Sequence, residues 1–184
     1  MLIFVTGGVR SGKSAFAEKL AVERSNARRI HYAATSRQTD PEMRERIRRH
    51  QEKRGASPVE WVTWEVERKI CLLHEKIEQE QVILLDCLTT LLNNELFQWK
   101  DAKCEILNIA ERRQLFYALL NGIERLQQNR ILIVVSNEIF HGILNDSYAS
   151  TFVYAAMLGK LHQRLVKQAD EAYLCENGIP IRLK

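Results

Sequence analysis

The sequence predicts an α/β fold in which helices flank a mostly parallel central sheet. Short apolar runs of strand length alternate along the chain with longer stretches of helical period. The runs at residues 2–6, 82–86 and 131–135 are almost continuously apolar, as expected for strands covered on both faces. The chain has 184 residues, 46% hydrophobic and 27% charged, which is ordinary for a globular protein. We therefore expect one domain, spanning residues 1–184, with one sizeable core.

The first half of the chain alternates strands with helices. A helix after residue 40 is indicated by Asp40 as N-cap and Pro41 at the first helical position. In chain order we expect a strand at 2–6, a helix at 14–24, a strand at 29–34, a helix carrying 43–53, a strand at 61–66, a helix at 67–79 and a strand at 82–86.

The second half continues the pattern and ends differently. Asn177-Gly178 between two short apolar runs is a typical hairpin turn. We expect helices in the region 101–128, a central strand at 131–135 that ends at Ser136-Asn137-Glu138, a helix at 148–168, and a closing hairpin from 171–174 and 179–183.

A phosphate-binding motif lies between the first strand and the first helix. The segment reads Gly7-Gly8-Val9-Arg10-Ser11-Gly12-Lys13-Ser14, which fits the pattern GxxxxGK[ST] of a P-loop. Its glycines let backbone N–H groups surround a phosphate, and the helix N-terminus adds its dipole. Lys13 would supply a positive charge and Ser14 would bind Mg²⁺. The motif predicts an enzyme that handles the phosphates of ATP or GTP.

A nucleoside triphosphate site also needs a carboxylate near the metal ion. Asp86 stands at the end of an apolar strand and can bind Mg²⁺ directly or through water. Glu138 also stands at a strand end and is the competing candidate. A polar residue at a strand end can alternatively be only a helix cap.

An unusual basic stretch surrounds one histidine. His50 lies among six cations between residues 44 and 54, on a predicted helix. Neighbouring cations disfavour imidazolium, so His50 should be neutral and able to act as a nucleophile, and the same cations could hold phosphates. On these residues alone, a solvated basic helix face with an incidental histidine is the favoured interpretation.

Composition limits the other functions. The net charge of +4 is modest and does not indicate a nucleic-acid partner. The four cysteines form no CxxC pair, so neither a zinc site nor a disulfide framework is indicated. No apolar run approaches the ~20 residues that span a bilayer, and Met1 leads directly into a strand. We expect a cytoplasmic protein without a membrane span.

An ordered set of motifs resembles one enzyme family. Besides the P-loop, the set comprises Ala33-Ala34-Thr35-Ser36, Glu42-Met43 with Arg46-Ile47 and His50, Leu84-Leu85-Asp86-Cys87-Leu88-Thr89, Val135-Ser136-Asn137-Glu138, Ala169-Asp170 and Gly178-Ile179-Pro180. Together these resemble the bifunctional adenosylcobinamide kinases/adenosylcobinamide-phosphate guanylyltransferases of cobalamin biosynthesis. The resemblance covers nearly the whole chain.

The resemblance implies a RecA-like fold, a homotrimer and two reactions. In the first, ATP or GTP phosphorylates the aminopropanol hydroxyl of adenosylcobinamide. In the second, GMP from GTP is joined to adenosylcobinamide phosphate and pyrophosphate is released. The guanylylated histidine of the family falls on His50, and Lys13 would also be catalytic. The implied nucleotide contacts are Gly7 through Ser14, Ala34, Thr35, Ser36, Gln51, Glu52, Lys53, Arg54, Glu65 and Asp86.

Two rival functions remain open from the sequence. One is a small P-loop kinase for another metabolite, in which His50 is an ordinary surface residue. The other is a RecA-like ATPase or nucleotide-gated regulator, in which the basic helix contacts nucleic-acid phosphates or a partner. Covalent nucleotide on histidine would distinguish the family function from a kinase for another metabolite, and salt-dependent DNA retention would favour the regulator.

Overall fold

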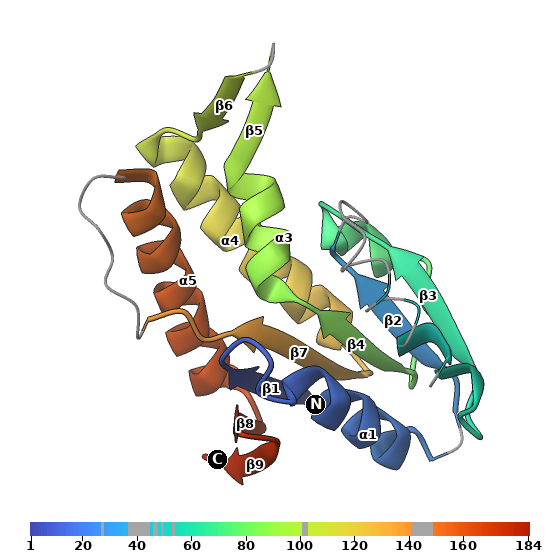
Figure 1. The fold of residues 1–184 in the computed structure, drawn as a ribbon. Helices are drawn as coiled ribbons and strands as arrows, with labels where there is room; N and C mark the ends of the chain where they lie inside the picture. Colours follow the sequence, from blue (N-terminus) through green and yellow to red (C-terminus); the bar gives the residue numbers. More distant parts are fainter. Residues whose placement is uncertain are drawn as a thin grey trace.

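A seven-stranded sheet forms the centre of the molecule (Figure 1). The computed structural model describes residues 1–26, 28–36, 45, 48, 50–52, 54–100, 103–140 and 149–184. The strand order is β3-β2-β4-β7-β1-β8-β9, and every neighbouring pair is parallel except β8 and β9. The strands are β1 (Leu2–Gly7), β2 (Ile30–Ala34), β3 (Trp61–Glu65), β4 (Val82–Asp86), β7 (Ile131–Asn137), β8 (Glu171–Glu176) and β9 (Ile179–Arg182). The predicted mostly parallel sheet and closing hairpin are confirmed.

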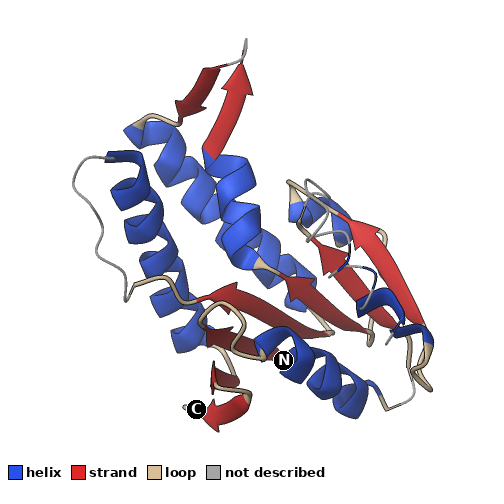
Figure 2. Ribbon diagram, viewed as in Figure 1, coloured by secondary structure: helices blue, strands red, loops and turns tan. Residues whose placement is uncertain are grey.

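Helices cover both faces of this sheet (Figure 2). On one face lie α3 (Leu88–Leu96), α4 (Ile109–Gln127) and α5 (Ala149–Gln168). On the other lies α1 (Lys13–Ser25). The described part of the segment 43–55 is helical at Glu45, Arg48, 50–52 and 54–55. The predicted cap at Asp40 and Pro41 and the start of the last long helix at Tyr148 lie outside the described residues.

The continuous apolar strands are explained by the two covered faces. Successive side chains of a strand point to opposite faces. In β1, Leu2 and Phe4 join the core shared with α3, α4 and α5, whereas Ile3 and Val5 join the core shared with α1. All four side chains are at most 1% exposed. Burial on both faces leaves no position from Leu2 to Val5 where a polar side chain would meet water.

The prediction of a helix at 67–79 is wrong. This segment contains only the short 3-10 helix η1 (Ile70–Leu73), and Lys69 before it is in the left-handed region with φ of 53°. The guanidinium of Arg130 donates to the carbonyls of His74, Ile77 and Glu78. Those carbonyls therefore bind a distant side chain instead of the N–H groups of a continuing helix.

The expectation of helices in the region 101–128 is confirmed for α4 (Ile109–Gln127) but missed the strand that precedes it. Before α4, β5 (Phe97–Lys100) and β6 (Lys103–Ile106) form an antiparallel hairpin that projects from the body of the molecule (Figure 1). Asn108 accepts from the N–H of Glu111, and the Glu111 side chain accepts from the N–H of Asn108. This capping box starts α4 at Ile109, so the chain before it is free to pair as a strand. No helix among the described residues is long and apolar enough to cross a membrane.

Candidate nucleotide-binding and catalytic site

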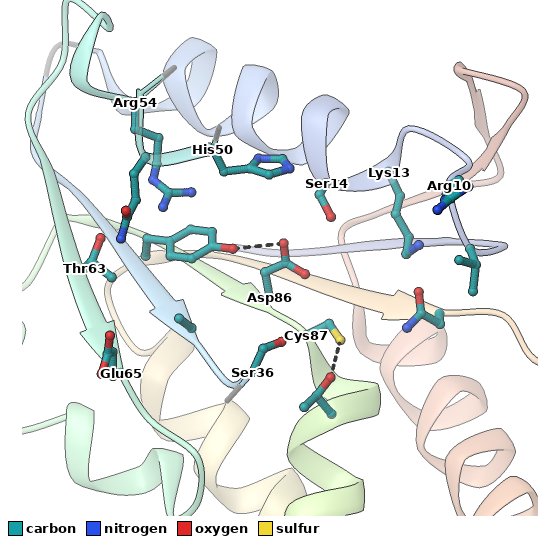
Figure 3. Close-up of a pocket in the computed structure, with 16 residues that line it drawn as sticks. Arg10, Lys13, Ser14, Ser36, His50, Arg54, Thr63, Glu65, Asp86 and Cys87 are labelled. Atoms are coloured by element: carbon teal, nitrogen blue, oxygen red, sulfur yellow. Dashed lines mark hydrogen bonds between the residues drawn. The ribbon is translucent and has the colours of Figure 1, made fainter. Parts of the chain in front are cut away.

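A cavity opens at the carboxyl ends of β1, β2, β4 and β7, where parallel α/β sheets bind ligands (Figure 3). It brings together residues that the sequence distributes over 129 positions, from the glycine loop to the end of β7. Its lining consists of Val9, Arg10, Lys13, Ser14, Tyr32, Ala34, Ser36, His50, Gln51, Arg54, Thr63, Glu65, Asp86, Cys87, Thr90 and Asn137. Eleven of the predicted site residues are in that set.

The P-loop gathers its phosphate-binding groups at the start of α1. Gly12 precedes the helix in the left-handed region, with φ of 86°, and the first turn carries no acidic residue. The Lys13 side chain is only 4% exposed, and its Nζ donates to the carbonyl of Gly8 at 2.9 Å. The positive end of the helix and a buried ammonium group therefore lie in one wall of the cavity.

The closing hairpin supports the P-loop from behind, which the sequence did not reveal. The N–H of Gly178, in the turn between β8 and β9, donates to the carbonyl of Ser11 at 3.0 Å. A Cβ on Gly12 would lie 3.1 Å from the Cα of Gly178. A Cβ on Gly7 would collide with the carbonyl oxygen of Cys175. Two of the loop glycines are thus required by close contact with this hairpin as well as by phosphate.

Of the two candidate carboxylates, Asp86 lines the cavity and Glu138 does not. The side chain of Glu138 accepts from the N–H of Phe140. Asp86 accepts from the hydroxyl of Tyr32 at 3.1 Å. Burial and the neighbouring carboxylate raise the pKa of Tyr32 well above its usual value, so the phenol stays a neutral donor.

The donor set suits Mg²⁺ bound together with phosphates. Ser14 and Asp86 offer a hydroxyl and a carboxylate to the same cavity. Mg²⁺ is commonly held by one or two protein oxygens, with the rest of its ligands from substrate phosphates and water. Within the described ranges no group of three or more histidine, cysteine or acidic side chains forms an all-protein metal cage. The residues present therefore fit a substrate-dependent magnesium site.

His50 lies at the cavity with a carboxylate against its ring. Its Nδ1 is 2.9 Å from Oε1 of Glu18, one helical turn beyond Ser14 in α1. The same Oε1 accepts from Nη1 of Arg54 at 2.8 Å. The guanidinium of Arg54 in turn lies 3.9 Å above the ring centre of Tyr32. The sequence placed His50 among six cations, and the structure adds an acidic partner from α1.

The remaining predicted residues divide into two groups. In Figure 3, Glu65 lies at the opposite end of the cavity from Arg10 and Lys13, together with Thr63, which the sequence did not predict. Ala34, Ser36 and Gln51 also line it. Thr35 is not in the lining: its hydroxyl donates to the carbonyl of Cys87 at 2.9 Å and accepts from the N–H of Cys87 at 2.8 Å. Thr35 thereby fixes the segment that follows Asp86.

Part of the basic helix faces solvent. Glu52 is exposed and pairs with Arg48, which also pairs with Glu45. Neither Glu52 nor Arg48 lines the cavity. Lys53 lies outside the described residues. The interpretation as a solvated helix face therefore fits Arg48, whereas His50, Gln51 and Arg54 turn toward the cavity.

Several lining or supporting residues escaped sequence reasoning. Tyr32 and Thr63 sit in strands with no motif of their own, and Glu18 belongs to the helix after the P-loop. Glu18 could have been noticed from its spacing, because it lies four residues after Ser14 and therefore on the same face of the helix. Asn137 stands at the predicted strand end beside Glu138, but only the lining distinguishes the two.

Comparisons with known proteins identify the family of the chain. The family model described as cobinamide kinase / cobinamide phosphate guanyltransferase matches residues 3–183. The bifunctional adenosylcobalamin biosynthesis protein CobU of Salmonella typhimurium is 34% identical, with 100% of both chains covered. The corresponding CobP of Pseudomonas aeruginosa is 33% identical, covering 98% of this chain and 95% of that one.

The fold is shared with a more distant solved structure. A KaiC-like protein from Pyrococcus horikoshii superposes with a TM-score of 0.50 at 11% identity, covering 94% of this chain and 69% of that one. The sheet order and the loop at the end of β1 are thus those of a RecA-like nucleotide-binding fold. On the match along its whole length, the chain belongs to the cobinamide kinase/cobinamide phosphate guanyltransferase family.

Proposed function

We propose that this chain catalyses both reactions for which its family is named, at one cavity. In the first, the γ-phosphoryl group of ATP or GTP passes to the aminopropanol hydroxyl of adenosylcobinamide. In the second, GMP from GTP is transferred through His50 to the resulting adenosylcobinamide phosphate. The observation that carries the proposal is that a P-loop, a strand-end carboxylate and His50 line the same cavity.

The kinase step uses the P-loop wall. Lys13 and the N-terminus of α1 stabilise charge that develops on the phosphates as the substrate hydroxyl attacks in line. Ser14 and Asp86 would hold Mg²⁺, which would neutralise phosphate charge. Tyr32 keeps the Asp86 carboxylate oriented by donating to one of its oxygens. No residue has to form a covalent bond in this step.

The guanylyl transfer needs a nucleophile, and His50 is the best placed. Cys87 also lines the cavity, but burial and then the charge of Asp86 raise the pKa of its thiol. A thiol held protonated is a poor nucleophile. Attack of a His50 ring nitrogen on the α-phosphorus releases pyrophosphate, and the corrinoid phosphate then displaces the histidine.

The end of the cavity opposite the P-loop suits the nucleoside. Glu65 carries an exposed carboxylate from β3, with Thr63 beside it on the same strand face. A carboxylate accepts two donors side by side, as the ring N–H and exocyclic amine of guanine provide. Glu65 is therefore our proposed contact to the base of GTP.

The proposal is tested by covalent labelling. Purified protein is incubated with GTP labelled in the α-phosphate, denatured and examined for retained label that is acid-labile and base-stable. We expect wild type and His74→Ala to retain label, and His50→Ala to retain none while keeping kinase activity. Lys13→Ala should lose both activities. Wild-type labelling of His50→Ala, with the same acid lability, would exclude His50 as the nucleophile.

The remaining family features are carried by resemblance. We propose a homotrimer, which light scattering on the purified chain would reveal as three times the mass of 21.4 kDa. The cytoplasmic location and the lack of a nucleic-acid partner stay predictions. Absence of covalent GMP together with salt-dependent DNA retention would support the regulator instead.

A further inference from the structure

We propose that Glu18 is the positioning residue for the histidine nucleophile and makes Nε2 of His50 the attacking atom. This inference rests on the proposed guanylyl transfer and adds to it the choice of nitrogen. Glu18 belongs to no motif of the family resemblance, and it does not line the main cavity. Its role follows from what it touches.

The Glu18 carboxylate joins two side chains of the basic helix to α1. Its Oε1 lies 2.9 Å from His50 Nδ1 and 2.8 Å from Arg54 Nη1. The three side chains are shielded from solvent: Arg54 is 6% exposed, Glu18 12% and His50 23%. Hydrogen bonds between charged groups in such surroundings are stronger and better oriented than on an open surface.

This arrangement determines which ring nitrogen carries the proton. A guanidinium only donates, so Oε1 of Glu18 already acts as an acceptor toward Arg54. A proton on that carboxylate would stand beside the positive charge of Arg54, which is unfavourable. The proton of the Glu18–His50 bond therefore belongs to Nδ1 of His50.

Nε2 is then the nitrogen with a free lone pair. Among the described residues no hydrogen bond to Nε2 of His50 is present, and the imidazole lines the cavity. Figure 3 shows the ring of His50 and the guanidinium of Arg54 on the same side of the cavity, with Asp86 facing them. The ring thus presents Nε2 to a nucleotide while Nδ1 is held from behind.

The transfer balances without moving the Nδ1 proton. The Nε2 lone pair forms a bond to the α-phosphorus of GTP, and the bond from that phosphorus to the β-phosphate oxygen breaks with release of pyrophosphate. The ring becomes a cation that keeps its Nδ1 proton. When a phosphate oxygen of the corrinoid attacks the same phosphorus, the N–P bond breaks and its electron pair returns to Nε2. The negative charge of Glu18 stabilises the cationic ring throughout.

The decisive variant is Glu18→Gln. Glutamine keeps the length of the side chain and an oxygen that can accept from Arg54, but it removes the negative charge and lets the amide donate to Nδ1. The proton would then move to Nε2, the wrong nitrogen for attack. We expect the single-turnover rate of covalent GMP formation to fall on the order of 10²- to 10⁴-fold. The KM for GTP and the thermal midpoint should stay near wild type.

Two further variants separate positioning from structure. Glu23→Gln makes the same chemical change on the same helix, at an exposed residue that pairs with Lys19 at 3.8 Å, and should leave the rate unchanged. Glu18→Asp restores the charge on a shorter side chain and should recover part of the rate. A purely structural Glu18 would instead lower the thermal midpoint or raise KM in Glu18→Gln without a selective loss of rate.

The linkage itself gives a direct readout. With ring-¹⁵N histidine, coupling between ³¹P and ¹⁵N in the trapped GMP-enzyme identifies the bonded nitrogen, and we expect Nε2. Covalent GMP on Nδ1, or a wild-type rate in Glu18→Gln, would overturn the role of Glu18 while leaving guanylyl transfer intact. Absence of covalent GMP from wild type would overturn the proposed function first, so the two failures are distinguishable.

Discussion

Tyr32 connects the histidine side of the cavity with the P-loop side. Its ring lies under the guanidinium of Arg54, and its hydroxyl donates to Asp86. Arg54 is bound in turn to Glu18, the partner of His50. One aromatic side chain thus contacts the groups proposed for both reactions. Its two functions can be separated, because the ring stacks and the hydroxyl donates.

Tyr32→Phe removes only the hydrogen bond to Asp86. We expect the Mg²⁺ concentration for half-maximal kinase activity to rise about 10-fold, as when an outer partner of a metal ligand is lost. A Mg²⁺ titration measures this. Tyr117→Phe removes the hydroxyl of an exposed tyrosine on α4 and serves as control. An unchanged Mg²⁺ response would mean that the Tyr32 hydroxyl does not orient Asp86.

At the scale of elements, the β8–β9 hairpin acts as a brace for the phosphate loop. Asn177 and Gly178 adopt positive φ of 50° and 83°, as a two-residue hairpin turn of type I′ requires. The turn places the Gly178 N–H against the carbonyl of Ser11. The conformation of the P-loop therefore depends on the conformation of a turn 167 residues further along the chain.

Gly178→Ala tests this brace. A Cβ there meets no atom within 4 Å, so its cost is backbone strain at positive φ, about 1 kcal/mol of unfolding free energy. We expect weaker GTP binding together with that loss. Calorimetric titration and urea unfolding measure the two effects. Gly159→Ala, in the middle of α5, should be neutral or stabilising and leave affinity unchanged. Equal GTP affinity in Gly178→Ala would show that the loop holds its shape unaided.

Elements with strong local signals could be predicted from the sequence. The run at 82–86 became β4 with unchanged bounds, since both faces of that strand are covered. The segment 67–79 failed because Arg130, far along the chain, takes its carbonyls. The hairpin before α4 was missed although Asn108 and Glu111 stand three apart, as a capping box requires. Local patterns identify elements unless a distant side chain competes for the backbone.

For the whole molecule, a buried hydrogen-bond chain makes stability depend on pH. Nε2 of His162 lies 2.7 Å from the hydroxyl of Ser136, which lies 3.0 Å from that of Thr89. The ring packs edge-on against Phe4 and Phe140. Burial lowers the pKa of His162 to about 4, with Glu138 opposing the shift. Between about pH 4 and 6.5, His162 is therefore protonated in the unfolded chain but neutral in the folded chain.

We therefore expect the free energy of unfolding to fall as pH falls from about 6.5 to 4, because the unfolded chain gains a proton at His162. Above about pH 6.5, His162 causes no such loss. The total loss from this group is about 3 kcal/mol. Urea unfolding at pH 7 and pH 4 measures it. Asparagine does not titrate. Between pH 7 and pH 4, the unfolding free energy of His162→Asn should therefore fall by about 3 kcal/mol less than that of wild type. An equal loss of unfolding free energy in wild type and His162→Asn would show that His162 does not cause this pH dependence.

Only those residues of the candidate site that belong to local sequence motifs could be predicted. The P-loop and Asp86 were readable because strand ends and glycine patterns are local. The partner of His50 was not, because Glu18 and His50 are 32 residues apart and meet only through packing of two helices. The choice between Asp86 and Glu138 likewise needed the positions of β4 and β7 in the sheet.

The position of β1 also bears on the order in which a ribosome delivers the parts of the site. The strand that carries the P-loop is synthesised long before its two neighbours, β7 and β8, which begin at residues 131 and 171. Contacts so distant along the chain form late. A nascent chain that ends before residue 171 has the whole phosphate motif and lacks both β8 and the turn that braces it. If the brace is needed, we expect the chain to bind nucleotide only after β8 and its turn have been synthesised, long after the phosphate motif itself has emerged.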